Sequence, residues 1–196
     1  MCIKRYRIVL IGIFASILAG CGTKNIGVND ATVMANYLTN CSPKTRYGIY
    51  DIDNNGCMEL LIAENDSHAD TVTILTPDSQ NQSLIEIGRY GSWGSMSYYP
   101  DGYILSGFTG QGIDETVIYK ITDGKVSVVH KFWDNSGSVG DEYEYKVDDE
   151  SVTEEKYYAL YNQYTGNNDG VHIGYDDFIP IDEYDVMYNT ILKYMH

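Results

Sequence analysis

The nine residues from Asp51 to Glu59 carry the most specific spacing of oxygen-bearing side chains in the chain: Asp-Ile-Asp-Asn-Asn-Gly-Cys-Met-Glu. Side chains at the first, third and fifth positions converge when the backbone turns sharply at a glycine in the sixth. The seventh position supplies only a backbone carbonyl, so a cysteine is tolerated there. Because Ca²⁺ takes six to eight oxygens in flexible geometry, this pattern predicts a structural calcium site with the ligands Asp51, Asp53, Asn55, Cys57 and Glu59.

The flanks of this segment do not fit an EF-hand. The twelfth position, where an EF-hand needs a bidentate glutamate, is Ile62, and the flanking segments are typical of strands rather than helices. A strand, the pattern Asp-x-Asp-x-Asn-Gly-x-x-Glu and a second strand, over residues 47–63, resemble the calcium loops of integrin-type propeller blades. Those loops carry an acid at the ninth position, as Glu59 does here. The resemblance implies calcium and does not extend to the propeller fold.

The alternative is an ordinary acidic hairpin turn. Three carboxylates would then crowd together with only Lys44 and Arg46 as nearby bases, at a cost in stability.

The first 21 residues predict export. Lys4, Arg5 and Arg7 precede an apolar run of 12 residues, Ile8 to Ala19, which is well short of the ~20 that span a bilayer as a helix. The segment Leu18-Ala19-Gly20-Cys21 that follows resembles the lipobox of bacterial lipoproteins. The resemblance implies cleavage before Cys21, a lipid on its thiol, and an extracytoplasmic protein anchored to the bacterial cell membrane. A plain secretory signal with a chance cysteine is the alternative.

Composition limits the partners. The chain has 196 residues and a formal net charge of −15, and three of its 13 basic residues lie in the first 20. The remainder is therefore still more acidic, which excludes nucleic acid as a partner and disfavours anionic headgroups. Its 19 tyrosines suit half-buried strand faces, or alternatively a surface on which sugars stack.

Cys41 and Cys57 are the two cysteines left when Cys2 leaves with the signal and Cys21 carries lipid. An even pair outside the cytosol predicts a possible disulfide, and two free thiols are the alternative.

Hydrophobic patterning predicts a mainly β, α+β protein with an antiparallel meander sheet. A short helix capped by Asn29 or Asp30 precedes the strands and ends before Pro43. The clearest hairpin turns at Thr122-Asp123-Gly124. A helix capped by Thr153 and a last helix capped by Asp182 follow, separated by a loop over residues 165–175. We expect a signal peptide at 1–20, a tether at 21–28 and one globular domain at 29–196.

No motif predicts catalysis. The four histidines lack the spacing of zinc ligands, and no nucleophile motif is present. A Gly- and Ser-rich region instead gathers aromatic residues that could form a platform for carbohydrate, among them Trp93, Tyr98, Tyr99, Tyr103 and Phe108.

From Cys21 to about Thr165 the chain resembles a group of small bacterial lipoproteins that share a lipobox, a short helix, the segment Tyr47 to Leu60, a β-rich middle and a late acidic helix. The resemblance implies location, calcium and architecture, but no biochemical role. We therefore expect a non-enzymatic lipoprotein that binds an extracellular ligand, either carbohydrate or protein. A carbohydrate-binding module using the aromatics of residues 90–108 is one alternative, and a hydrolase with an unrecognised acidic site is another.

Overall fold

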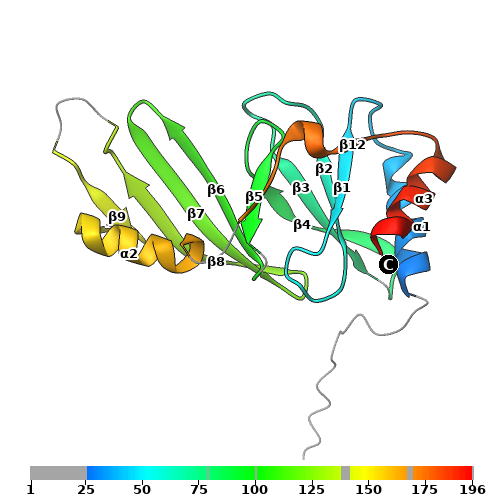
Figure 1. Cartoon of the computed structure of the whole chain (residues 1–196), viewed down its shortest axis with the longest axis horizontal. Helices are drawn as coiled ribbons and strands as arrows, with labels where there is room; N and C mark the ends of the chain where they lie inside the picture. Colours follow the sequence, from blue (N-terminus) through cyan, green and yellow to red (C-terminus); the bar gives the residue numbers. More distant parts are fainter. Residues whose placement is uncertain (1–25, 79, 100, 138–141, 167–169, 196) are drawn as a thin grey trace, which may run out of the picture.

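The computed structural model describes residues 26–78, 80–99, 101–137, 142–166 and 170–195. Within these ranges the chain forms two antiparallel sheets and three α-helices, so the predicted mainly β class is confirmed. Figure 1 shows an elongated molecule with α1 and α3 at one end, the first sheet beside them, and the second sheet with α2 at the other end. No helix in the described ranges is both long and apolar enough to cross a membrane.

The first sheet is a meander closed at one edge by a short late strand. Its order is β12-β1-β2-β3-β4, and every pairing is antiparallel. The strands are β1 (Arg46–Tyr50), β2 (Glu59–Ala63), β3 (Val72–Asp78), β4 (Ser83–Tyr90) and β12 (Ile179–Pro180).

Strand β2 is buried along its whole length because both faces of the first sheet are covered. Leu60 and Ile62 pack in a cluster with α1 (Ile26–Leu38) and α3 (Tyr184–Tyr194). Leu61 and Ala63 alternate with them and pack against the second sheet. A run of apolar residues without polar alternation is what a strand covered on both faces requires.

The second sheet is a longer meander with the order β10-β9-β8-β7-β6-β5-β11. Its strands are β5 (Met96–Tyr99), β6 (Tyr103–Gly110), β7 (Ile113–Thr122), β8 (Lys125–Asp134), β9 (Tyr145–Val147), β10 (Glu150–Val152) and β11 (Val171–Ile173). Helix α2 (Glu154–Thr165) covers one face of β7–β9, where Phe132 meets Tyr157 and Tyr161 edge to face. Many of the tyrosines thus lie on half-buried faces of strands and of this helix.

The predicted hairpin at Thr122-Asp123-Gly124 is confirmed as the β7–β8 connection. Asp123 and Gly124 both have positive φ, at 49° and 68°, which is the conformation of a two-residue type I′ turn. The N-cap of α2 is also as predicted, since the Thr153 hydroxyl accepts from the backbone N–H of Lys156.

Several boundaries differ from the prediction. Helix α1 begins at Ile26, so Asp30 lies buried inside it rather than capping it, and the last three residues of the expected tether are helical. Glu183, not Asp182, is the N-cap of α3. The expected loop over residues 165–175 contains β11, which pairs with β5, and a 3-10 turn follows at Tyr175–Asp177.

Candidate metal centre

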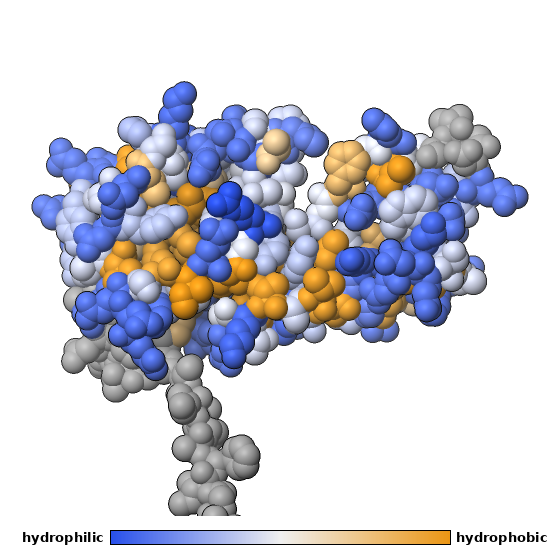
Figure 2. Space-filling model, turned by 180° about the vertical axis from the view of Figure 1, so that it is seen from behind, coloured by the Kyte–Doolittle hydropathy of each residue, from blue (hydrophilic) through white to orange (hydrophobic). Residues whose placement is uncertain are grey.

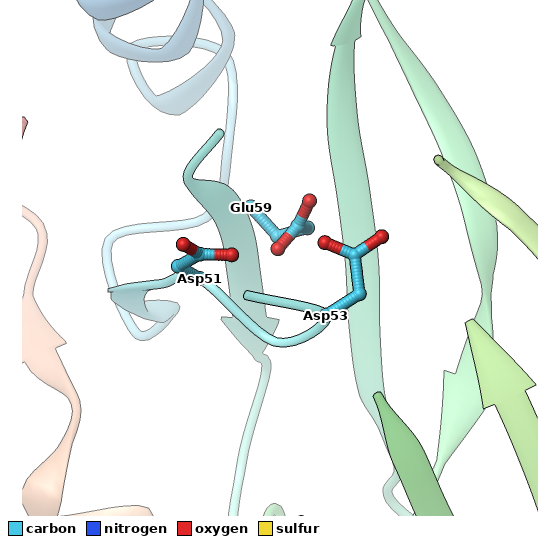
Figure 3. A group of neighbouring side chains, drawn as sticks. All are labelled: Asp51, Asp53 and Glu59. Atoms are coloured by element: carbon cyan, nitrogen blue, oxygen red, sulfur yellow. The ribbon is translucent and has the colours of Figure 1, made fainter. Parts of the chain in front are cut away.

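The acidic segment is the connection between β1 and β2, as the sequence predicts. Tyr50 pairs with Glu59 at the end of the hairpin, so the chain leaves β1 at Asp51 and returns to the ladder at Glu59. Gly56 has a φ of 84°, which an L side chain rarely adopts and which the sharp turn needs. Figure 3 shows the carboxylates of Asp51, Asp53 and Glu59 pointing toward one another, the first two from the loop and the third from β2.

These three carboxylates form a group that could hold a metal ion. One oxygen from each lies within 4.8 Å of the others. Asp51 and Asp53 are half-buried, whereas Glu59 is 0% exposed. One fully buried carboxylate and two half-buried ones are typical of a metal-binding loop rather than of a solvated acidic turn.

Backbone donors within the loop itself hold two of the three side chains, those of Glu59 and Asp51, in place. One oxygen of Glu59, Oε2, accepts from the N–H of Ile52 at 3.0 Å. Asp51 accepts from Asn55 at 3.0 Å and from Gly56 at 2.9 Å, which closes the loop on itself. The loop therefore holds its carboxylates in position through its own peptide groups.

Two carboxylate oxygens at the centre are buried without a donor. Among the residues that the structure describes, neither Oδ1 of Asp53 nor Oε1 of Glu59 has a hydrogen-bond partner. The ion pairs of the described residues do not involve the three acids either, and Arg46 at the other end of β1 pairs with Asp176. Buried oxygens with neither donor nor counter-charge are costly unless a proton or a cation compensates them.

The electrostatic consequence is largest at Glu59. Burial, followed by the negative charges of Asp53 and Asp51, raises the pKa of Glu59 to about 8. Burial likewise raises the pKa of Asp53, with a further contribution from Asp51. Without a cation, the cluster therefore retains a proton near neutral pH.

The second sheet completes the surroundings of the loop. Oδ2 of Asp53 accepts from the N–H of Asp123 in the β7–β8 turn at 2.9 Å. Gly102 lies against Asp53 with a φ of 83°, and a Cβ there would lie 2.6 Å from the Ile121 carbonyl oxygen and 3.1 Å from Asp53 Cβ. The motif itself gave no sign of these partners, because they come from turns about 50 and 70 residues later.

The other two predicted ligands are placed differently. The amide oxygen of Asn55 accepts from the backbone N–H of Cys57 at 2.6 Å, so in this structure it serves the turn. Cys57 was predicted to contribute its backbone carbonyl, and that contribution stays a prediction.

The predicted disulfide between Cys41 and Cys57 is wrong, because Cys41 is a free thiol. Its Sγ donates to the carbonyl of Tyr37 at the end of α1, at 3.6 Å. Cys41 precedes β1 and Cys57 follows it, and a five-residue strand is about 17 Å long. A disulfide needs Cα atoms within ~7 Å.

The five predicted platform aromatics do not form one surface. Tyr98 is buried in the core between the sheets, and Tyr99 is half-buried. Tyr103 lies on the other face, against Tyr164 of α2 at 5.1 Å between ring centroids. Trp93 and Phe108 are 54% and 49% exposed, and both rings contact His68 edge to face.

A pocket on the second sheet was missed at the level of sequence. It lies beside Trp133, and no motif in the sequence marks this residue. The signal available was the alternation along β8, which places Lys131 and Trp133 on one face and Phe132 on the other.

The predicted signal peptide at 1–20, the predicted lipidation site at Cys21 and the first part of the predicted tether lie outside the described residues. No protein-family model, curated protein or solved structure matches the chain.

Proposed function

We propose that this chain is a non-enzymatic, lipid-anchored lipoprotein of the bacterial cell surface, and that its acidic loop holds a structural calcium ion. The proposal of a metal site rests on two buried oxygens that accept no hydrogen bond from the described residues, one on Glu59 and one on Asp53. An ion among the three carboxylates would satisfy both oxygens and reduce the formal charge of the loop from −3 to −1. The lipid anchor rests on Leu18-Ala19-Gly20-Cys21.

The ligand chemistry favours calcium over other ions. All of the candidate ligands are oxygens, whereas zinc prefers nitrogen and sulfur. Magnesium demands near-ideal octahedral geometry and keeps several waters, which fits poorly with a carboxylate buried at the base of a turn. Calcium tolerates irregular geometry and accepts waters in its remaining positions.

A structural role is supported by burial. A catalytic ion keeps a coordination position open to substrate, whereas Glu59 is fully buried and Asp53 is engaged by the second sheet. An ion here would fix the β1–β2 loop in the shape that contacts the β7–β8 turn. We therefore assign its effect to stability, and ligand binding to another surface.

Thermal unfolding of the purified full chain in calcium and in chelator tests whether the acidic loop binds calcium. Extracellular modules bind calcium at ~10⁻⁴–10⁻³ M. At ~100 times the dissociation constant the ion adds about 2.7 kcal/mol to the free energy of unfolding, which raises Tm by about 5–10 °C in a domain of this size. Magnesium at the same concentration should give a smaller rise.

Two isosteric variants sharpen this experiment. Asp51→Asn should abolish the calcium-dependent rise in Tm, because it removes a charged ligand and keeps the shape of the side chain. Asp66→Asn, which alters an exposed acid in the β2–β3 loop, should leave the rise unchanged. Identical melts of the unaltered chain in calcium and in chelator would overturn the metal site.

A further inference from the structure

A pocket with a volume of about 290 Å³ opens on the second sheet. Its lining combines one indole with charged side chains of both signs: Glu115, Lys131, Phe132, Trp133, Lys146 and Asp149. They come from β7, β8, β9 and the turn after β9. Concave sites with an aromatic surface and a few polar groups are the usual form of a small-molecule site.

The strand register places the chemistry of this pocket on one face. Trp133 pairs with Glu115 on β7 and with Lys146 on β9, so the three side chains form a row across three adjacent strands. Phe132, the next residue along β8, is fully buried against α2. The row therefore lies on the face of the second sheet away from α2. Figure 2 shows the molecule from behind, with hydrophobic side chains among hydrophilic ones over the surface.

We propose that this pocket binds a neutral saccharide, with a pyranose ring stacked on the indole of Trp133. One face of a pyranose is lined by C–H groups and packs on an aromatic ring, while its hydroxyls point outward and both donate and accept hydrogen bonds. Lys131 and Lys146 supply donors, and Glu115 and Asp149 supply acceptors. This inference rests on the proposed binding role and names its ligand class.

Charge selects a neutral ligand over an anionic one. The two lysines and two acids of the pocket sum to zero formal charge, and Glu144 lies 3.2 Å from the Lys146 ammonium, which offsets it further. The chain as a whole carries −15, which repels polyanions. A uronic-acid polymer would therefore meet no excess of positive charge here.

In the free protein, the Lys146 ammonium occupies the face of the Trp133 ring on which the sugar would stack. It lies 4.5 Å from the centroid of the Trp133 ring, a cation–π contact on an aromatic face that would otherwise meet water. The side chain is flexible and partly exposed, so the ammonium can leave the ring and bind a hydroxyl when a sugar stacks there. The exchange replaces one favourable contact on the indole with another.

The pocket is separate from the acidic loop. That loop contacts the β7–β8 hairpin at Asp123, whereas the pocket uses Glu115 near the start of β7. Eight residues of extended strand separate the two, about 25 Å. Loss of one site can therefore be measured independently of the other.

Intrinsic fluorescence gives a direct readout, because the chain has two tryptophans. In a Trp93→Phe variant, Trp133 is the only indole. We would titrate this full-chain variant, in saturating calcium, with cellotetraose, mannotetraose, xylotetraose and chitotetraose, and with tetragalacturonate as the anionic counterpart. At least one neutral tetrasaccharide should change the Trp133 emission saturably, and tetragalacturonate should not. No change with any neutral tetrasaccharide, or a change with tetragalacturonate alone, would overturn the proposal.

Calorimetric titration with the responsive sugar tests which residues contribute to binding, with each substitution made singly in the unaltered chain, which retains Trp93. Trp133→Ala should weaken binding by about tenfold or more, since it removes the stacking surface. Lys131→Ala, an exposed substitution that should not disturb folding, should weaken it severalfold. Trp93→Ala is the matched control, because it removes the other tryptophan, which is exposed and outside the pocket.

Each outcome of this series bears on the proposal. Loss with Trp133→Ala or Lys131→Ala but not with Trp93→Ala supports it. Loss with Trp93→Ala alone would move binding to the cluster of Trp93, His68 and Phe108 and overturn the pocket. The calcium-dependent rise in Tm, measured on the same variants, should be unchanged, so a failure of the saccharide site leaves the calcium result intact.

Discussion

Oδ2 of Asp53 accepts a hydrogen bond from the backbone N–H of Asp123 at 2.9 Å, across 70 residues of sequence and from one sheet to the other. The acidic loop is therefore not only a hairpin end of the first sheet. Its conformation is coupled to the β7–β8 turn, and whatever compensates its charge also affects how the two sheets meet.

Gly102→Ala should destabilise the protein and weaken its response to calcium. The added Cβ would lie 2.6 Å from the Ile121 carbonyl oxygen and 3.1 Å from Asp53 Cβ, at a φ of 83°. We expect a loss of about 1–3 kcal/mol, measured as a lower midpoint of denaturant unfolding. Gly174→Ala is the control, since its Cβ would meet only the side chain of Asp177 at 3.3 Å. Equal midpoints for the two variants would contradict the close approach of loop and turn.

Glu59→Gln should keep the fold and lose the calcium response. The amide oxygen can still accept from the Ile52 N–H, and the amide nitrogen can donate toward the neighbouring oxygens of Asp53 and Asp51, as the O–H of a protonated acid would. In chelator, Tm should equal or exceed that of the unaltered chain at pH 8. Differential scanning calorimetry with and without calcium measures both effects. A full calcium-dependent rise in the variant would exclude Glu59 as a ligand.

The pKa of Glu59 predicts how stability varies with pH in the absence of metal. Its pKa is about 8 in the folded protein, against 4.5 ordinarily. Between these values the folded state holds a proton that the unfolded chain has lost, so the free energy of unfolding falls as pH rises and is unaffected by this group below pH 4.5.

Calcium should cancel this trend, because the ion binds the deprotonated cluster and so keeps Glu59 ionised in the folded protein across this window. The difference in Tm between calcium and chelator should therefore widen as pH rises through the same window. The contribution of Glu59 is isolated by subtracting the same series for Glu59→Gln. A difference that does not change with pH would show that Glu59 is ionised in the metal-free protein.

Tyr157→Phe should destabilise the second sheet. Its hydroxyl donates to Oδ2 of the buried Asp134 at 2.9 Å, and among the described residues Asp134 would then keep only its bonds from Ser136. Losing a buried hydrogen bond to a charged group costs about 1.5–3 kcal/mol, measured by urea unfolding. Tyr143→Phe, at a residue 65% exposed, should change the midpoint little.

Cys21→Ala should release the protein from membranes or leave it uncleaved, because we propose that the cysteine of the lipobox-like segment carries the anchor. One acyl chain holds a protein only marginally, whereas two or more hold it firmly. Fractionation of cells and the intact mass of the purified chain measure both properties. Membrane retention and normal cleavage in the variant would contradict lipidation.

The sequence predicted the local part of the site and missed its distant part. The spacing from Asp51 to Glu59 and the strand patterns beside it are local, so the convergence of the three carboxylates follows from one hairpin. The contacts from Gly102 and Asp123 depend on how two sheets pack, and alternation along a strand does not reveal which strands share a sheet.

The same limit explains the aromatic platform. Closeness in sequence suggested one surface, but successive side chains on a strand point to opposite faces. Tyr98 and Tyr103 belong to different clusters of the core, one between the sheets and one under α2. The pocket at Trp133 uses residues from three strands, and no local window contains that combination.

Helix α1 packs against α3 at one end of the molecule (Figure 1). The length of chain before α1 therefore limits how far that end can lie from a membrane. Four residues lie between Cys21 and Ile26, where α1 begins, and the five Cα-to-Cα steps from one to the other reach about 17 Å when the chain is fully extended. If Cys21 carries lipid, the end of the molecule formed by α1 and α3 stays close to the lipid headgroups. The pocket, at the other end of the long axis, then faces away from the bilayer, where it can meet polymers of the surrounding medium before they reach the membrane.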